Sequence, residues 1–437
     1  MPLLKVHDFH ALAGDLASLA GATSLFAARA AEKLARLREE LEPLAEAYDV
    51  VVANPPYMGS KNMGKWLASW VSDNYPDEKR DLFSSFIIRN LALGADGAQL
   101  GFMTPYVWMF ISSYKQLRAT LIGENTITSL IQLEYSGFAG ATVPICTFTL
   151  EKGYVEGYKG GYVRLSDFVG PEQQAPLALE ALANPECGWI YRADAANFEK
   201  IPGSPIAYWA SESLLNAFLS NPSLNAISTP KQGLVTGDND TFLRYWWEVG
   251  DSKVEYHCLS RKESINGKAR WFPCNKGGGY KKWYGFNEYL IDWENDGYRL
   301  CHFVDASGKL RSRPQNIDYC FQPGCTWGTI SSAYLTMRYS PAGFISEHAG
   351  SMIYESASPS LDSFILGFCN SSTAELILRI LSPTLRFTEG PIGMLPIAYS
   401  DKHARKLKSI VTSNINVAKL DWDYRETSWD FKRHPLV

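Results

Sequence analysis

Several signatures of common protein classes are missing from this 437-residue sequence. No uninterrupted apolar run approaches the roughly 20 residues of a membrane-spanning helix, and the amino terminus does not resemble a signal peptide. None of the eight cysteines forms a C-x-x-C pair, so neither a disulfide framework nor a common zinc site is expected. No Glu-x-Lys triplet occurs, so the usual signature of a metal-dependent nuclease is absent. These absences favour a cytoplasmic protein with free thiols and no membrane partner.

A cluster of potential metal ligands does not change this interpretation. Cys258, Cys274, Cys301, Cys320 and Cys325 lie in the same region as two histidines, at positions 257 and 302. Structural zinc sites use short, regular ligand spacings, and the spacing here is irregular. We therefore predict no metal site.

An overall surplus of positive charge is also missing, because 42 Lys and Arg face 46 Asp and Glu, a net charge of −4. That balance does not favour nucleic-acid binding, since phosphate contacts need local positive charge. Residues 261–313 differ, with eleven Lys or Arg, six Asp or Glu and ten aromatic residues. Such a mixture suits backbone contact and base stacking, although a β-rich module with an aromatic core and solvated lysines would look the same. The candidate DNA-binding residues in this window are Arg270, Lys276, Lys281, Lys282 and Trp283.

The most informative segment is the tetrad Asn54-Pro55-Pro56-Tyr57, which follows an apolar, β-branched run over residues 48–53. This run predicts a buried strand of a parallel sheet, and such strands place functional residues at their carboxyl ends. Asn54 should therefore lie at a strand tip, followed by a loop that two prolines stiffen. An ordinary Asn-Pro turn is the alternative interpretation.

The tetrad suits methylation of an aromatic amine, a poor nucleophile whose lone pair is delocalised into its ring. The Asn54 side-chain oxygen and the Pro55 carbonyl would accept hydrogen bonds from that amine. They would thereby favour the pyramidal, positively charged nitrogen that develops during methyl transfer. Tyr57 would stack on the base, a contact worth ~1–3 kcal/mol. The candidate catalytic residues are Asn54, Pro55, Pro56 and Tyr57.

Along the rest of the chain, the predicted secondary-structure pattern changes twice. Up to residue 155, alternating helical and strand patterns predict an α/β fold with a doubly wound sheet. Helices are expected over residues 24–47 and from residue 82, where Asp81 is a plausible N-cap, and strands over residues 98–103, 126–133 and 145–150. Scattered prolines in residues 156–225 indicate a connector. Short β-like runs predict a β-rich domain over residues 226–437, with a helix near residues 372–381.

The tetrad is accompanied by further recognisable segments, which are residues 48–61, 81–83, 102–105, 271–273, 276–278, 283–285, 338–344 and 428–431. In these segments the chain resembles the PglX-type adenine-specific DNA methyltransferases of bacterial BREX phage-defence systems. More distantly, it is similar to type IIG restriction-modification methylases. Several amine and amide methylases share the tetrad alone, but the combination of segments is specific.

The resemblance implies both a fold and an activity. Residues 1–155 would be the C-terminal part of a methyltransferase catalytic domain with a partial Rossmann-like sheet. Residues 226–437 would be an α+β, β-rich target-recognition domain that binds double-stranded DNA. The reaction would transfer a methyl group from S-adenosylmethionine to the exocyclic amine of adenine, in phage defence or restriction-modification. The tetrad would hold an adenine flipped out of the duplex.

One departure from the family concerns the cofactor. The family's glycine-rich loop, Asp-Pro-x-x-Gly-x-Gly, and its acidic ribose-binding residue have no match in residues 1–53. We therefore expect the S-adenosylmethionine site to lie largely outside this chain, with its residues unknown. A fragment or split gene product would need an N-terminal methyltransferase segment, or another phage-defence subunit, as its partner. The alternatives are a non-catalytic DNA-recognition module and, less favoured, methylation of a protein glutamine or of ribosomal RNA.

Overall fold

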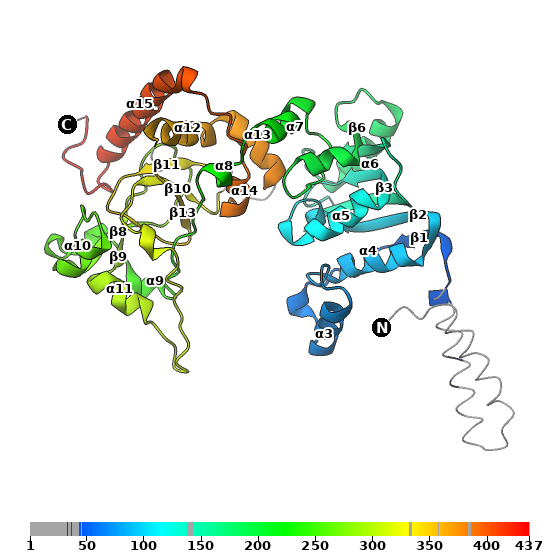
Figure 1. Ribbon diagram of the computed structural model, residues 1–437, viewed down its shortest axis with the longest axis horizontal. Helices are drawn as coiled ribbons and strands as arrows, with labels where there is room; N and C mark the ends of the chain where they lie inside the picture. The colour runs from blue at the N-terminus through cyan, green and yellow to red at the C-terminus, as the bar shows by residue number, and fades with distance from the viewer. Residues whose placement is uncertain are drawn as a thin grey trace, which may run out of the picture. The chain divides into compact units, whose positions relative to one another are not determined.

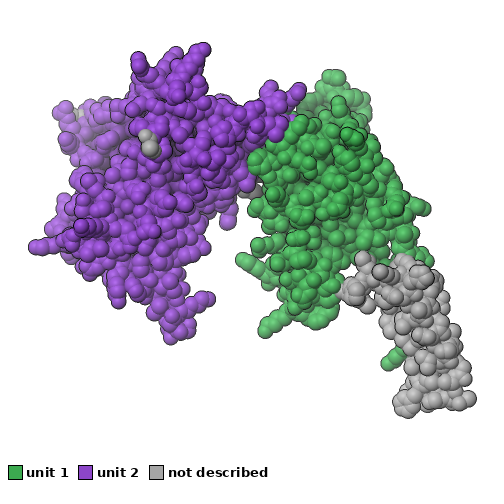
Figure 2. Space-filling view, in the orientation of Figure 1, with its two compact units in different colours: residues 1–211 green, residues 212–437 purple. Residues whose placement is uncertain are grey.

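The computed structural model describes residues 46–137, 143–331, 334–356, 358–382 and 386–436, together with residues 33, 36, 43 and 44. The chain folds as two compact units, residues 1–211 (unit 1) and 212–437 (unit 2), which are green and purple in Figure 2. The helix predicted over residues 24–47 falls almost entirely outside the described residues. So does most of residues 1–53, in which the family's cofactor loop has no match.

A six-stranded mixed sheet with the strand order β1-β2-β4-β3-β5-β6 forms the centre of unit 1 (Figure 1). β1 is parallel to β2 and β3 is parallel to β5, whereas β4 runs antiparallel to both of its neighbours and β6 is antiparallel to β5. The strands are β1 (Tyr48–Ala53), β2 (Gly94–Pro105), β3 (Asn125–Gln132), β4 (Ile145–Lys152), β5 (Lys159–Arg164) and β6 (Ile190–Asp194). The helices are α3 (Lys65–Asn74), α4 (Leu82–Leu93), α5 (Lys115–Gly123) and α6 (Pro171–Ala183). The α/β class and the three strands predicted after the tetrad are confirmed.

The main core of unit 1 lies on one face of this sheet. Leu100 and Phe102 of β2 and Phe148 of β4 pack with Ile87 of α4 and Leu117 of α5, and all five are buried. The side chains that face the core alternate along β2, as expected for a strand with one covered face. α4 and α5 therefore cover the face of the sheet that is opposite to the exposed residues of β1.

β1 corrects one prediction, because it is an edge strand that is buried on one face only. Val51 and Ala53 pack against the core, whereas Val50 and Val52 are 63% and 77% exposed. Within the described residues, β2 is the only strand that pairs with β1. An apolar, β-branched run looks the same in sequence whether or not its second face is covered, so the pattern could not reveal this exposure.

The predicted connector, residues 156–225, is also corrected. β5 pairs with β3 and β6 pairs with β5, so this segment completes the sheet of unit 1 and does not link two finished domains. α6 packs over β5, where Ala181 forms a small core with Val163 and Leu165. Unit 1 accordingly extends to Ser211, well past the predicted boundary at residue 155.

Unit 2 contains two small sheets, with strand orders β11-β10-β13 and β12-β8-β9-β7. Its strands are β7 (Leu243–Tyr245), β8 (Trp271–Asn275), β9 (Tyr289–Asp292), β10 (Gly324–Gly328), β11 (Met337–Ser340), β12 (Ile345–Ser346) and β13 (Gly350–Tyr354). Its longer helices are α7 (Glu212–Ser220), α10 (Arg261–Asn266), α11 (Glu294–Cys301), α12 (Pro359–Cys369), α13 (Ser372–Leu381) and α15 (Ala404–Asp423). The short helices are α8 (Leu224–Ile227), α9 (Asn239–Phe242) and α14 (Glu389–Gly393). The helix predicted near residues 372–381 is α13, and the α+β character predicted for this part is confirmed.

No single described helix is long and apolar enough to cross a bilayer. The adjacent pair α12 and α13 passes by length and composition when taken together, with a bend of 70° between the two helices.

Three of the clustered cysteines belong to an apolar core of unit 2. Cys258, Cys274 and Cys320 pack with residues such as Phe272 and Trp293. Burial raises the pKa of each of these thiols, so they remain protonated at neutral pH. In the part of the chain that the structure describes, no group of three His, Cys, Asp or Glu side chains is arranged to hold a metal ion.

Candidate active site

The tetrad lies directly after β1, at the carboxyl ends of two parallel strands. Ala53, the last residue of β1, pairs with Phe102 of β2. Pro55 is buried, whereas Asn54, Pro56 and Tyr57 are exposed. The buried proline anchors the loop, and the side chains on either side of it remain accessible to a substrate. The structure thus brings the four predicted catalytic residues together at a strand tip.

The Tyr57 hydroxyl connects the ends of β1 and β2. It lies 3.1 Å from Asn54 Oδ1 and 3.1 Å from the backbone oxygen of Met103, so it can donate to either acceptor. Burial raises the pKa of Tyr57, which keeps the phenol protonated and a donor at neutral pH. An amide oxygen has two lone pairs, so Asn54 can accept from Tyr57 and from a substrate amine together. Tyr57 therefore orients the Asn54 oxygen in addition to any stacking role.

Asp81 fastens the loop that follows the tetrad to the start of α4. Its Oδ1 accepts hydrogen bonds from the backbone N–H groups of Met58, at 2.9 Å, and of Phe83, at 3.4 Å. Backbone bonds from Leu82 to Met58 and from Ser60 to Arg80 close the same junction. Asp81 is thus the N-cap of α4, as predicted, and also a tether for the tetrad loop.

Replacing Asp81 with alanine should lower the free energy of unfolding of unit 1 by about 1–2 kcal/mol. The change removes an N-cap, typically worth ~1 kcal/mol, and leaves the Met58 N–H without its acceptor. Asp81→Asn is the matched control, because its side-chain oxygen can accept the same bonds. Urea unfolding of the three proteins measures the difference, and equal losses in both variants would contradict the tether.

The wild-type chain and the Asp81→Asn variant should also differ in how their stability depends on pH. Burial raises the pKa of the Asp81 carboxyl above its ordinary value, against the opposing effect of the backbone bonds. The folded state then binds more protons than the unfolded state between the two pKa values, so this group's contribution to stability declines as pH rises through that interval. Relative to Asp81→Asn, the wild-type chain should therefore lose stability on going from acidic to neutral pH.

Arg118 was not identified from the sequence, although it organises the segment after β2. It is 1% exposed, and its guanidinium donates to the backbone oxygens of Trp108, Ile111 and Gly203. Burial lowers its pKa to about 10, which leaves it charged at neutral pH. A single arginine in an amphipathic helix gives no sequence signal for such a role, because its acceptors are backbone atoms of distant residues.

Known proteins are similar both to the region of this loop and to most of the chain. Residues 23–138, which include the tetrad, match the family model described as Eco57I restriction-modification methylase. The chain is 36% identical over 399 residues to the adenine-specific methyltransferase PglX of Lacticaseibacillus casei (strain Zhang). It is 34% identical over 400 residues to the adenine-specific methyltransferase BrxX of Escherichia coli O9:H4 (strain HS). Each match covers 90% of this chain. The resemblance to PglX-type methyltransferases is confirmed.

The chain spans only about a third of these PglX-type relatives, 33% of PglX and 31% of BrxX. Two solved structures have a similar fold. The type IIL restriction-modification enzyme MmeI, in complex with DNA, matches 91% of this chain and 53% of its own, with a TM-score of 0.56 at 11% identity. A nuclease-deletion mutant of the type ISP enzyme LlaGI, with a DNA substrate mimic, matches 88% of this chain and 36% of its own, with a TM-score of 0.51 at 12% identity.

The candidate DNA-binding residues lie in unit 2, and two of them contact neighbours around β8 and β9. Arg270 precedes β8 and donates to Asp292, which also forms an ion pair with Arg299. Lys276 follows β8, and its ammonium lies 4.6 Å from the centre of the Tyr289 ring. Both cations are therefore already engaged within the chain.

The other three candidates form a loop that packs against helices. Lys281 forms a 2.9 Å ion pair with Asp421 of α15, and Lys282 donates to the backbone oxygen of Asn370. Trp283 has a φ of 76°, an uncommon conformation for a bulky residue, and hydrogen-bonds through its backbone to β11. The five candidates do not make one free basic surface, and their role in DNA binding stays a prediction.

Proposed function

We propose that this chain forms part of an adenine-specific DNA methyltransferase. Unit 1 would hold the target adenine at the tetrad, and unit 2 would bind and recognise the double-stranded DNA. The methyl group would come from S-adenosylmethionine and would be transferred to the exocyclic amine of adenine. By analogy with the PglX-type relatives, the enzyme would act in phage defence.

One observation carries this proposal, namely the placement of Asn54. Asn54 is exposed at the carboxyl end of β1, which runs parallel to β2, and the Tyr57 hydroxyl orients its side-chain oxygen. Ligands of α/β sheets bind at this end of the strands. A hydrogen-bond acceptor fixed there favours the positive charge that develops on an attacking amine, and no general base is needed before the attack.

The methyl donor would be bound with the help of residues beyond those described. In α/β sheets the ligand crevice opens where the strand order reverses, which requires strands on both sides of it. Among the described residues, β1 is the edge of its sheet, and Val50 and Val52 leave one of its faces open. The described residues therefore supply one wall of such a crevice, formed by the tetrad and the start of α4. A further methyltransferase segment that pairs with the free edge of β1 and covers its open face would complete it.

A matched pair of variants tests whether the open face of β1 is covered in the complete enzyme. The test protein is a chimera in which this chain replaces the matching 399-residue segment of the Lacticaseibacillus casei PglX. Val52→Asp should weaken S-adenosylmethionine binding at least tenfold, because it buries a charge when the face is covered. Val169→Asp is the control, since Val169 is 75% exposed, close to the 77% of Val52. Calorimetric binding that is equal in both variants would contradict the proposed assembly.

The activity itself is tested with methyl-labelled S-adenosylmethionine and the same chimera. We expect the label to appear in double-stranded DNA, on the adenine amine, and not in added protein or ribosomal RNA. Nucleoside analysis after digestion of the DNA identifies the methylated base. Label in protein glutamine or in RNA would favour the alternative substrates, and no label in any substrate would favour a non-catalytic recognition module.

A further inference from the structure

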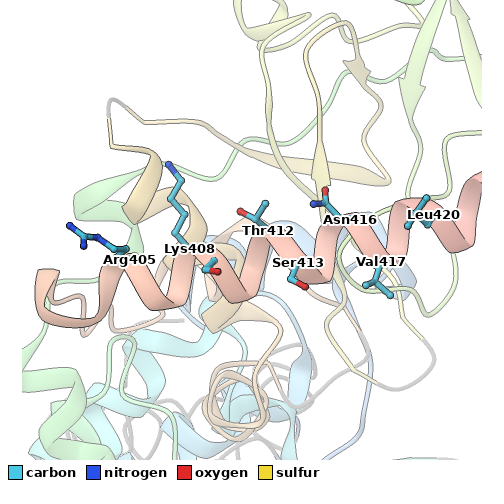
Figure 3. Close-up of a pocket in the computed structure, with 8 residues that line it drawn as sticks. Arg405, Lys408, Thr412, Ser413, Asn416, Val417 and Leu420 are labelled. Atoms are coloured by element: carbon cyan, nitrogen blue, oxygen red, sulfur yellow. The ribbon is translucent and has the colours of Figure 1, made fainter.

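The outward face of α15 presents a row of hydrogen-bond donors. Arg405, Lys408, Thr412 and Asn416 are spaced three or four residues apart, so they share one side of the helix, and all four are exposed. Figure 3 shows these residues in a row along α15, with Lys408, Thr412 and Asn416 projecting in the same direction. They line an open groove of about 540 Å³ together with Ser409, Ser413, Val417 and Leu420. We call the row from Arg405 to Asn416 the α15 stripe.

The charged residues of α15 are all basic from its start to residue 420. Residues 402–420 contain five Lys or Arg and no Asp or Glu. No ion pair involves Arg405 or Lys408 within the described residues, whereas Lys419, nearer the end of the helix, pairs with Asp423 and Asp430. The stripe therefore combines two uncompensated cations with neutral hydroxyl and amide donors.

These donor types are the ones that contact nucleic-acid backbones. Arg, Lys, Thr and Asn side chains supply many of the hydrogen bonds to phosphate oxygens in protein–DNA complexes. At a rise of 1.5 Å per residue, the stripe covers roughly 17 Å. One DNA strand carries a phosphate every ~3.4 Å along the duplex axis, so several phosphates fall within that length. The length and the chemistry of the stripe thus match a short stretch of one strand.

We propose that the α15 stripe binds the phosphate backbone of duplex DNA and so positions unit 2 without reading sequence. The proposal rests on the proposed function, in which unit 2 is the DNA-binding part. A docked protein helix is less favoured, because such a partner needs apolar residues every three or four positions. The α15 stripe has none, and the apolar Val417 and Leu420 lie at one end of the groove.

The test is a salt titration of DNA binding by the 437-residue chain and its double variant Arg405→Gln, Lys408→Gln. The probe is a fluorescent duplex of mixed sequence, followed by anisotropy. Each lost phosphate contact lowers the slope of log affinity against log salt concentration by about 0.9. We expect the slope to fall by about 2 and the affinity to fall about tenfold or more, equally for unrelated sequences. Both substitutions are on the surface, so the fold should be retained.

Two controls separate a local contact from a change in net charge or in apolar docking. Lys253→Gln, Lys432→Gln removes the same charge from two exposed lysines of unit 2 that lie outside both the basic window and the α15 stripe, and should change the slope much less. Val417→Ser, Leu420→Ser should leave DNA affinity unchanged. Equal effects of the two lysine-containing double variants, no effect of the α15 variant, or a larger loss in the Val417 and Leu420 variant would each overturn the proposal. Absence of DNA binding by the wild-type chain would instead count against the function proposed for unit 2.

Discussion

Replacing Asn54 with alanine should lower methyl transfer by the chimeric enzyme about 100- to 1,000-fold. The amide oxygen accepts a hydrogen bond from the amine as positive charge develops on it, and losing one such pre-oriented group typically costs ~2.7–4 kcal/mol of transition-state stabilisation. Because the interaction strengthens in the transition state, the loss should fall mainly on kcat and less on KM. Labelled-methyl transfer to DNA under steady-state conditions measures both constants.

The effect of this substitution should remain local. Tyr57 keeps the backbone oxygen of Met103 as an acceptor, and the Asp81 tether does not involve Asn54. DNA affinity should therefore stay within about twofold of wild type, since the phosphate contacts that dominate affinity lie elsewhere. Asn62→Ala, a change at an exposed asparagine in the same loop, is the matched control and should leave turnover unchanged. Undiminished turnover by the Asn54 variant would remove the catalytic role from the tetrad.

The features that the sequence predicted well are those set by local chemistry. The strand before Asn54, the N-cap at Asp81 and the helix α13 each follow from a few neighbouring residues. The prolines of the tetrad likewise restrict the backbone whatever surrounds them. Local rules therefore placed the candidate catalytic loop at its strand tip before any tertiary contact was known.

The features that it missed depend on distant contacts. Gly160 and Gly161 fall within the predicted connector, yet they lie in β5. A Cβ atom on Gly160 would be only 2.4 Å from the backbone oxygen of Ile127 in β3, so glycine is needed there for close strand approach. This requirement comes from residues more than thirty positions away, and no local pattern reports it.

Distant contacts also affect the charge count over the basic window, residues 261–313 of unit 2. Lys281 counts as positive charge in the window, but its partner Asp421 lies 140 residues away. A charge count along the chain includes such a lysine and cannot subtract a distant carboxylate. Arg405 and Lys408 fall outside the window, and among the described residues neither forms an ion pair, in contrast to Lys281.

Replacing Arg118 with alanine should destabilise unit 1 by about 3–5 kcal/mol. The guanidinium donates to three backbone carbonyls, at distances of 2.6 to 3.1 Å, and is almost completely buried. Its removal takes the guanidinium donor from the carbonyls of Trp108 and Gly203, whereas the Ile111 carbonyl keeps the Tyr114 N–H. Each buried group left unsatisfied costs ~1–3 kcal/mol. Hydrogen exchange along a urea series measures this stability for unit 1 and unit 2 separately, because each peptide reports its own unit.

Lysine at position 118 distinguishes the role of charge from that of geometry. Lysine keeps the positive charge but has a single nitrogen, which cannot reach carbonyls on both sides as the planar guanidinium does. We expect Arg118→Lys to recover less than half of the loss, and Arg192→Ala, at an exposed arginine of β6, to cost under about 0.5 kcal/mol. Full recovery by lysine would mean that charge alone suffices. Recovery of less than half would instead mean that the geometry of the guanidinium is needed. Arg118 would then fix the segment after β2, the strand whose Met103 carbonyl accepts from Tyr57. This would connect a buried arginine to the candidate active site.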